Sequence, residues 1–363
     1  MFIFNDFDLI VNNIEIGTIQ KLYKEKENLQ KKINEQLQRD TDFIKISANH
    51  SPEFIQPIIN NHIFFTLETL KIKNTKGIIE NLTWEFATYY NMGISFNFFK
   101  YILHYTLKEI EQFNDDSYIG FIKFYKYILE HYDDFILKAK KFSTKEAVPY
   151  KKEVYNDFMN ALLEPNLSKA ISISNNFIKT KEDISVFWER VILSSLYSIG
   201  IKWSQGEISV GQEHTATSIC ERVMSEHYSK IIDKFDKKLR VLVSVSPNEL
   251  HEVGSRMIGD MLELNGYDIV YLGSNSSENE IIDTIITKNI DVVLISTTIV
   301  ANINLVKKLI SKIRHNIRQK ELKIFVGGQA YSVDEKLVEE VGADCYISCS
   351  NKLLEVLKEL EDA

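Results

Sequence analysis

The feature that most limits the fold of this chain is a set of five short runs rich in β-branched residues near its C-terminal end. Each run is followed by an amphipathic stretch long enough for a helix, and such alternation of nearly continuous apolar strands with helices is typical of a parallel sheet covered on both faces. We therefore predict a Rossmann-like, five-stranded α/β domain over residues 238–363. The predicted strands cover residues 240–246, 268–273, 291–297, 323–328 and 344–349, and the helices lie near 252–265, 278–288, 303–316, 333–340 and 351–361.

The loop after the first predicted strand contains the sequence Glu249-Leu250-His251. Ligands of open parallel sheets bind beyond the carboxyl ends of the strands, which is where this loop lies. A histidine there can bind a metal through one ring nitrogen while a nearby carboxylate holds the other nitrogen. Taken alone, the pair is better explained by an ordinary surface histidine.

Polar and glycine residues follow His251 along the chain in a definite order and at definite spacings. The order is Glu-x-His-x-x-Gly, a gap of 41 residues, Ser-x-Thr, a gap of 28 residues and Gly-Gly. This order resembles the signature of cobalamin-binding Rossmann-like domains, Asp-x-His-x-x-Gly, Ser-x-Leu and Gly-Gly, with Glu and Thr as departures. The residues concerned are Glu249, His251, Gly254, Ser296, Thr298, Gly327 and Gly328.

The resemblance implies roles for these residues. His251 would be the lower cobalt ligand, replacing the dimethylbenzimidazole base of cobalamin, and Glu249 would orient its ring. The displaced nucleotide tail would run past Ser296, Thr298 and the Gly327–Gly328 pair. Glycines permit close backbone approach, hydroxyls can satisfy polar atoms, and neutral imidazole is a good ligand for transition metals.

Residues 152–232 precede the sheet and predict a four-helix bundle, with breaks at Pro165, near Lys181 and at 204–209. Trp203 ends one of these helices, and Glu213-His214 opens the next after nine residues. Taken alone, this pair is better explained by a core tryptophan beside a partly exposed helix start.

Placed before a cobalamin domain, however, the pattern resembles the Trp-x9-Glu-His motif of adenosylcobalamin-dependent photoreceptors of the CarH type. That resemblance covers residues 152–363. It implies that Trp203 and Glu213 enclose the adenosyl group, and that His214 becomes the upper cobalt ligand after light breaks the cobalt–carbon bond.

Residues 1–148 predict an all-helical domain that differs in composition from the rest. The first 150 residues hold 16 of the 21 Phe and 10 of the 17 Tyr, but only 4 of the 14 Gly. CarH-type repressors begin instead with a helix-turn-helix domain. The order of a helical sensor domain followed by a cobalamin-binding half resembles that of the photocobilins, whose globin-like domain binds a bilin.

A bilin such as biliverdin would bind here without a thioether bond, because the first 150 residues contain no cysteine. Haem is an alternative, with His62 or His131 as axial ligand, while His104 lies among Tyr and Lys residues. The alternative is that these histidines and aromatic residues simply form the hydrophobic core of the domain.

Charge and cysteine content narrow the functional classes. The formal net charge of −8 argues against nucleic acid as a main partner. Three cysteines, none before Cys220, indicate a reducing cytoplasm, and no run reaches the roughly 18 apolar residues of a membrane span. The apolar start carries Asp6 and Asp8 and lacks a basic region, so we do not interpret it as a signal peptide.

These observations predict a cytoplasmic, adenosylcobalamin-binding light sensor that is not an enzyme. We expect it to signal through a homo-oligomeric interface, as a dimer or tetramer, or through a separate downstream protein. The alternative is a corrinoid methyl carrier serving a methyltransferase. Such a carrier needs no adenosyl pocket around Trp203 and Glu213.

Overall fold

The computed structural model describes residues 4–47, 50–142, 152–228, 239–317 and 322–362. Contacts divide the chain into two compact units. The first comprises Met1–Lys145 with Ser204–Gly206, and the second comprises Glu146–Trp203 with Glu207–Ala363. The predicted boundaries near 148–152 and 232–238 fall largely outside the described residues, so the three-domain division stays a prediction.

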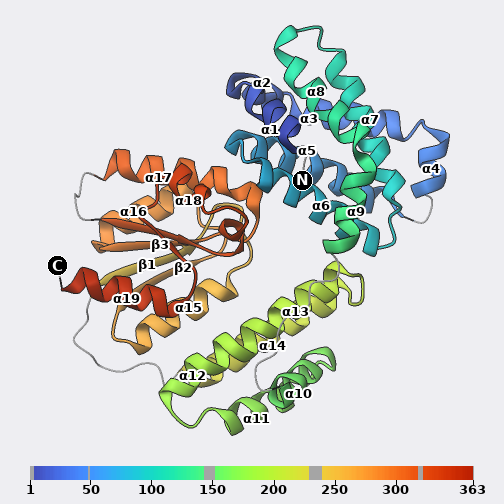
Figure 1. Ribbon diagram of the computed structural model, residues 1–363. Coiled ribbons are helices and arrows are strands. Elements are labelled where there is room, and N and C mark those ends of the chain that lie inside the picture. The colour runs from blue at the N-terminus through green and yellow to red at the C-terminus, as the bar shows by residue number, and fades with distance from the viewer. Residues whose placement is uncertain (1–3, 48–49, 143–151, 229–238, 318–321, 363) are drawn as a thin grey trace. The chain divides into compact units, whose positions relative to one another are not determined.

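The first unit is all-helical, as predicted (Figure 1). Residues 116–141 do not form a single helix, because His131 ends one helix with φ −101 and ψ 21. The elements are α1 (Phe4–Asn13), α2 (Ile16–Lys24), α3 (Lys26–Leu37), α4 (Thr41–Ser47), α5 (Pro52–Ile72), α6 (Thr75–Asn91), α7 (Phe96–Glu111), η1 (Asp116–Tyr118), α8 (Ile119–Glu130) and α9 (Tyr132–Phe142).

Aromatic side chains fill the core of this unit. The ring of Phe7 stacks on Phe124 with centroids 5.4 Å apart and on Tyr127 at 5.0 Å. Phe86 and Phe99 lie 4.8 Å apart, and both are fully buried. The high Phe content of the first 150 residues therefore supplies apolar packing, since aromatic pairs of this geometry stabilise a core beyond their buried area.

The second unit begins with the predicted four-helix bundle, here called the cap (residues 152–228). The last of its three breaks, at 204–209, ends in a reciprocal N-cap: the Gln212 amide donates to Ser209 Oγ (3.3 Å), and the Ser209 amide donates to Gln212 Oε1 (2.9 Å). α12, η2 and α13 form one continuous helix with a π-helical turn. The elements are α10 (Lys152–Leu163), α11 (Leu167–Phe177), α12 (Lys181–Phe187), η2 (Trp188–Ile192), α13 (Leu193–Ser204) and α14 (Val210–Tyr228).

The continuous cap helix, Lys181–Ser204, is long and apolar enough to cross a membrane by length and composition alone. Its most apolar 18-residue window has a mean hydropathy of 1.3 and is 39% buried. Core helices of globular domains pass the same test. Because Trp188, Val191 and Ile192 are fully buried in the cap core, we interpret this segment as a cap helix.

A five-stranded parallel sheet follows, in the order β2-β1-β3-β4-β5. This confirms the predicted Rossmann-like fold. The chain reverses its winding direction between β1 and β3, which is the position where ligands of such sheets bind. The strands are β1 (Arg240–Val245), β2 (Asp268–Gly273), β3 (Val292–Ser296), β4 (Lys323–Gly327) and β5 (Cys345–Ile347).

Helices cover both faces of this sheet (Figure 1). α15 and α19 pack on one face through Leu262 and Leu353, and α16, α17 and α18 lie on the other. Met257 and Met261 of α15 also belong to the buried core of the cap, so the cap packs against the sheet domain through α15. The elements are α15 (Val253–Leu264), α16 (Glu278–Lys288), η3 (Val300–Asn302), α17 (Ile303–Asn316), η4 (Gln329–Val333), α18 (Lys336–Val341) and α19 (Ser350–Glu361).

We expect Gly328→Ala to destabilise the second unit, and Gly254→Ala to serve as its matched control. Gly328 has φ +98, and a Cβ there would lie 2.3 Å from the Thr297 carbonyl oxygen. Such backbone strain costs about 1–3 kcal/mol. Gly254 lies in α15 with no atom within 4 Å of a built Cβ, so alanine should stabilise the helix slightly. Urea unfolding of cofactor-free protein measures both, and equal stability of the two variants would contradict the account.

Candidate functional site

The strand register brings the separated parts of the sequence motif to one edge of the sheet. Val245 at the end of β1 pairs with Ser296 at the end of β3, and Ser296 pairs with Gly327 at the end of β4. The Ser246 amide continues this ladder by donating to the Ser296 carbonyl at 2.9 Å. Residues 51 and 31 positions apart in the sequence therefore become neighbours at the position where ligands bind.

A tight turn places Glu249 and His251 beyond the end of β1. The Glu249 amide donates to the Ser246 carbonyl at 3.1 Å, which closes a four-residue turn with Pro247 and Asn248 at its centre. Asn248 adopts the left-handed conformation, with φ 62. Proline followed by a residue that tolerates positive φ is the pattern that such a turn requires, so the local sequence determines this geometry.

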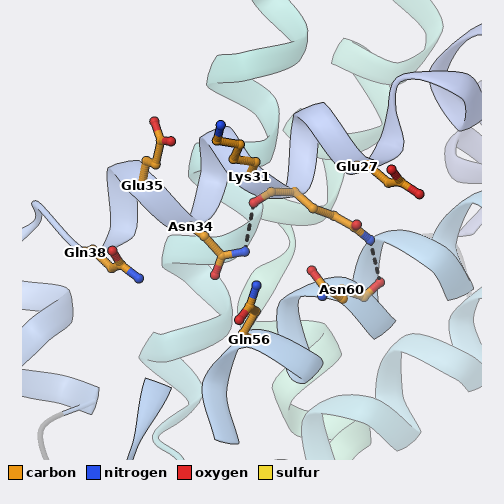
Figure 2. A pocket seen from close by; sticks show the side chains of 8 residues that line it. Glu27, Lys31, Asn34, Glu35, Gln38, Gln56 and Asn60 are labelled. Atoms are coloured by element: carbon orange, nitrogen blue, oxygen red, sulfur yellow. Dashed lines mark hydrogen bonds between the residues drawn. The ribbon is translucent and has the colours of Figure 1, made fainter. Parts of the chain in front are cut away.

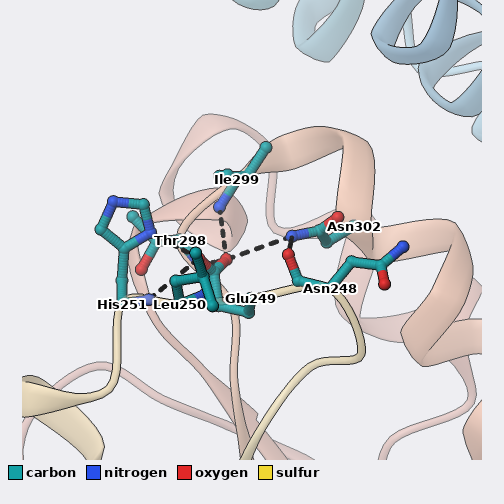
Figure 3. Close-up of polar contacts among 7 residues, drawn as sticks. All are labelled: Asn248, Glu249, Leu250, His251, Thr298, Ile299 and Asn302. Atoms are coloured by element: carbon teal, nitrogen blue, oxygen red, sulfur yellow. Dashed lines mark hydrogen bonds and ion pairs between the residues drawn. The ribbon is translucent and has the colours of Figure 1, made fainter. Parts of the chain in front are cut away.

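The carboxylate of Glu249 is completely buried and surrounded by donors (Figure 3). Oε2 accepts from the backbone amides of Thr298 and Ile299, both at 3.0 Å, in the loop after β3. Oε1 accepts from the amides of Leu250 at 3.2 Å and His251 at 3.3 Å. Burial acts to raise the pKa of this carboxyl, but the hydrogen bonds from His251 and from the β3 loop hold it below its ordinary value.

Asn302 completes this arrangement and was not singled out by the sequence. Its side-chain Nδ2 lies 3.3 Å from Glu249 Oε2, and the residue is 1% exposed. It ends η3 and precedes α17, at the helix start beside the β1 loop. A polar residue at that position, after the strand that neighbours β1, is the signal that could have identified it.

His251 presents its imidazole to solvent above this buried carboxylate. Nδ1 is bonded to Glu249 Oε1, and the side chain is 60% exposed. The hydrogen bond to Glu249 raises the pKa of His251 against the lowering effect of burial, and the charges of Glu249 and Glu213 add to the increase. The ring is thus held by one nitrogen, and Nε2 is the atom placed to bind a metal.

Two observations fit a large ligand with a single protein bond to its metal. Ser246 Oγ is buried and has no hydrogen-bond partner among the described residues, and space is open around Gly254. Within the described ranges, no group of three or more His, Cys, Asp or Glu residues could hold a metal ion. The held His251 imidazole beside open space suits a metal that arrives already held in a cofactor, with His251 as one added ligand.

The two glycines of the Gly-Gly pair are explained by the sheet itself. A Cβ on Gly327 would lie 3.0 Å from the Ile347 carbonyl oxygen of β5, and one on Gly328 would overlap the backbone of Thr297. They permit the loops after β3 and β4 to lie close together. Their contact with a nucleotide tail, and that of Ser296 and Thr298, stays a prediction.

In the cap, Trp203 is half-buried at the end of α13, and Glu213 and His214 lie in the first turn of α14. The charge of Glu213 contributes to the raised pKa of His251. His214 Nδ1 is 2.6 Å from Glu213 Oε2, but its side chain is 73% exposed. A hollow of about 420 Å³ is lined by His214, by Arg222 and other residues of α14, and by Pro165 and Leu167 near the start of α11.

The histidines of the first unit differ in burial, and the Nε2 atom of the buried His62 has no hydrogen-bond partner among the described residues. His62 is fully buried, with Nδ1 2.9 Å from Glu85 Oε2, and its ring lies against Phe99 and Tyr125. His131 pairs with Asp134 at 3.4 Å, and His104 is exposed.

A hollow in the first unit lies between α3 and α5 (Figure 2). It measures about 200 Å³ and is lined by amide and charged side chains, among them Gln30, Asn34, Gln56 and Asn60. Pockets for drug-sized ligands hold about 300–1,000 Å³ and are mainly apolar. This hollow therefore does not suit a bilin or a haem.

We expect Glu249→Gln to lower the pKa of the His251 imidazole from above its ordinary 6.5 toward or below that value, because burial then acts without the opposing carboxylate. NMR titration of cofactor-free protein measures it. Glu213→Gln is the matched control and should cause a smaller decrease, since only its charge acts on the ring. An unchanged pKa in Glu249→Gln would refute the assignment.

A change in pH has opposite effects on folding stability and on metal binding at His251. The contribution of His251 to the free energy of unfolding is complete below pH 6.5 and is lost as pH rises through the raised pKa. Metal binding requires neutral imidazole, so it weakens as pH falls through that same pKa.

Replacement of Asn302 should loosen the site without unfolding the sheet. Asn302→Ala removes one donor from the buried Glu249 carboxylate, and we expect cobalamin affinity to fall by about tenfold, as for other groups that orient a metal ligand. Asn265→Ala, which removes an exposed amide at the end of α15, is the control. Equal affinities in a spectrophotometric titration would show that Asn302 has no such role.

Comparisons with known proteins agree with this geometry. Profiles described as B12 binding domain match residues 239–351 and, separately, residues 154–226. Monomethylamine corrinoid protein 2 of Methanosarcina acetivorans is 22% identical over 197 residues, which cover 53% of this chain and 90% of that protein. The trimethylamine corrinoid protein of Methanosarcina barkeri is 22% identical over 221 residues, covering 59% and 96%.

The solved structure of the Methanosarcina barkeri monomethylamine corrinoid protein shares the fold. It has a TM-score of 0.50 and 16% identity, and the alignment covers 58% of this chain and all of that one. The agreement concerns the helical bundle and the Rossmann-like sheet.

These relatives overturn the light-sensor interpretation. They are corrinoid proteins named for methylamines, so the comparisons favour the methyl-carrier alternative. The role of His214 as a cobalt ligand after photolysis rested on that interpretation and falls with it. The comparisons give no support to a globin-like or bilin-binding first unit. What the matches do establish is that residues 154–226 and 239–351 form a cobalamin-binding module, a helical cap followed by a Rossmann-like sheet domain.

Proposed function

We propose that this chain is the corrinoid methyl carrier of a methyltransferase system. In this role the protein is not itself a methyltransferase but holds a cobalamin whose methyl group partner enzymes load and remove. The observation that carries the proposal is the exposed His251 imidazole, held by the buried Glu249 at the ligand-binding edge of the sheet. The methylamine corrinoid relatives support a small methylated compound, such as a methylated amine, as the source of the methyl group.

The residues of the chain would bind and orient the cofactor. His251 Nε2 would ligate cobalt, with Nδ1 held by Glu249. Bound cobalamin would supply a cobalt centre that accepts and releases a methyl group. Open space at Gly254 and the Ser246 hydroxyl would accommodate the tail that His251 displaces.

The imidazole–carboxylate pair would also control a proton. Glu249 keeps its charge because its pKa is lowered, so it can hold a proton on His251 Nδ1. With Nδ1 protonated, the neutral ring exposes an unprotonated Nε2 for the metal. Partner binding is part of the proposal, since a carrier acts only with enzymes that donate and accept the methyl group.

A methylation cycle tests this function. Purified protein is loaded with hydroxocobalamin, reduced without oxygen and treated with methyl iodide, and the absorbance spectrum reports conversion to protein-bound methylcobalamin. We expect repeated cycles of loading and release, the latter to a thiol with an added methyltransferase. His251→Ala should bind cobalamin about 10–100-fold more weakly, because the protein ligand is lost.

The matched control is Trp203→Ala. A carrier should bind methylcobalamin equally well without this side chain, because it needs no adenosyl pocket. Binding of adenosylcobalamin with exclusion of methylcobalamin, or loss of methylcobalamin binding in Trp203→Ala alone, would contradict the carrier function.

A further inference from the structure

The cap contains a hollow that the proposed function does not use. It measures about 420 Å³ and lies where the start of α11 meets α14. Pockets for drug-sized ligands hold about 300–1,000 Å³ and are mainly apolar, with a few polar groups. The hollow in the cap reaches that size, unlike the smaller, polar hollow between α3 and α5.

Apolar side chains form one part of this hollow. Ile219 is 5% exposed and belongs to the buried core of the cap, and Leu167 packs against that core. Pro165 lies in the turn before α11 and also lines the hollow. Burial of an apolar group against these side chains is favourable, because it removes apolar area from water.

The polar part of the hollow carries positive charge and hydrogen-bond donors. His214, Ser218 and Arg222 follow each other on α14 at intervals of four residues, so they lie along one face of the helix. Among the described residues that line the hollow there is no Asp or Glu, although the chain has 51 acidic residues against 43 Lys and Arg. A ligand that matches this charge is an anion.

Arg222 differs from other arginines of the second unit because it is unpaired. Three arginines of the sheet domain each contact a carboxylate at 2.6–3.2 Å. Arg222 makes no hydrogen bond or ion pair with any residue that the structure describes, and in the same ranges the Ser218 hydroxyl has no hydrogen-bond partner. A guanidinium offers a planar pair of donors that matches a carboxylate or phosphate, and a nearby hydroxyl can add a third donor.

The carboxylate of Glu213 does not line the hollow, although Glu213 precedes His214 in the sequence. Its Oε2 lies 2.6 Å from His214 Nδ1, and its Oε1 accepts from Thr217 Oγ1 at 3.0 Å. The imidazole of His214 is thereby held through Nδ1 at the edge of the hollow. This carboxylate is therefore occupied by its neighbours on α14 and does not fill the place of a ligand.

The hollow lies on a different side of α14 from the contact with the sheet domain. Cys220 and Met224 are buried in the cap core, which also contains two methionines of α15. Residues two positions apart in a helix point in nearly opposite directions, about 200° around the axis. Ser218 and Arg222 each lie two positions from Cys220, so their side of α14 faces away from that core and from α15.

We propose that this hollow is a second binding site, separate from the cobalamin site, for a small organic anion. Arg222 and Ser218 bind the carboxylate or phosphate head of the ligand, and Leu167 and Ile219 contact its apolar body. The inference goes beyond the methyl-carrier function and does not depend on it, because none of these residues holds the cofactor.

Titration calorimetry of full-length, cobalamin-loaded protein with benzoate and with phenyl phosphate tests the site. Both probes carry a ring and an oxyanion, and together they distinguish a carboxylate head from a phosphate head. We expect at least one probe to bind with a dissociation constant of about 1 mM or below. Benzamide, which has the same ring without the charge, should bind about tenfold more weakly than benzoate or worse.

Two results of these titrations would contradict the proposal. One is the absence of binding by both ring-bearing probes. The other is inorganic phosphate that binds as tightly as phenyl phosphate, because this would show an adventitious ion only, held by surface charge without the apolar part of the hollow.

Substitution of Arg222 assigns the head group to this side chain. Arg222→Gln should weaken binding of the tighter probe about tenfold or more, because the charged donor pair is lost. Arg222→Lys keeps the charge without the planar fork and should cause an intermediate loss. Arg190→Gln is the matched control, since Arg190 is an exposed arginine of the same cap that does not line the hollow. Equal weakening in Arg222→Gln and Arg190→Gln would show that only overall charge matters and would refute the site.

Methyl NMR of isoleucine-labelled protein locates the bound probe. The δ1-methyl signal of Ile219, assigned with Ile219→Val, should shift when the tighter probe is added. Arg222→Gln should reduce that shift at the same probe concentration. An Ile219 signal that does not respond while calorimetry detects binding would place the probe elsewhere and overturn the inference.

A spectrophotometric titration with methylcobalamin separates this site from the cofactor site. We expect Arg222→Gln to bind methylcobalamin as the unsubstituted protein does. A matching loss of cobalamin affinity would assign the hollow to the cofactor site and so contradict a second site. If the unsubstituted protein binds no cobalamin, the proposed function fails, and the probe titrations repeated without cobalamin still decide this inference.

Discussion

Burial of one charge, the Glu249 carboxylate, is the constraint on which the site depends. A buried carboxylate is costly unless donors surround it. Here they come from its own turn and from the β3 loop, and they also hold the pKa of the carboxyl low. The loops after β1 and β3 are therefore fixed relative to each other, and the orientation of His251 follows from that fixed pair.

The cap adds a second constraint through α15, a helix that serves two cores. One side of α15 packs on the sheet through Leu262, and Met257 and Met261 pack among the cap helices. Because α15 begins directly after the His251 loop, the packing of the cap acts on the element that carries the ligand. The first unit, by contrast, has its own aromatic core, and its polar hollow between α3 and α5 is unsuited to a tetrapyrrole.

The light-sensor interpretation failed because it depended on three residues at a helix boundary. Trp203 and the Glu213-His214 pair flank the turn between α13 and α14. Any helical bundle has, at such a turn, the end of one helix, an N-capping residue and the start of the next helix. The charge of Glu213 does act on His251, but a charge near the site does not specify which group lies above cobalt. The matches to corrinoid relatives extend over about 200 residues and therefore discriminate better than the short pattern.

The sequence by itself determined the local elements. Strand and helix order, the Pro247–Asn248 turn and the Ser209 cap all follow from short-range preferences, and the spaced motif identified His251 and Glu249. Only the tertiary structure decided which distant groups meet them. The contacts of Asn302 and of the β3 loop amides with Glu249 depend on strand register, and the contact of α15 with the cap depends on cap packing. The physical reason is that these contacts join residues with no fixed separation along the chain, so no local periodicity encodes them.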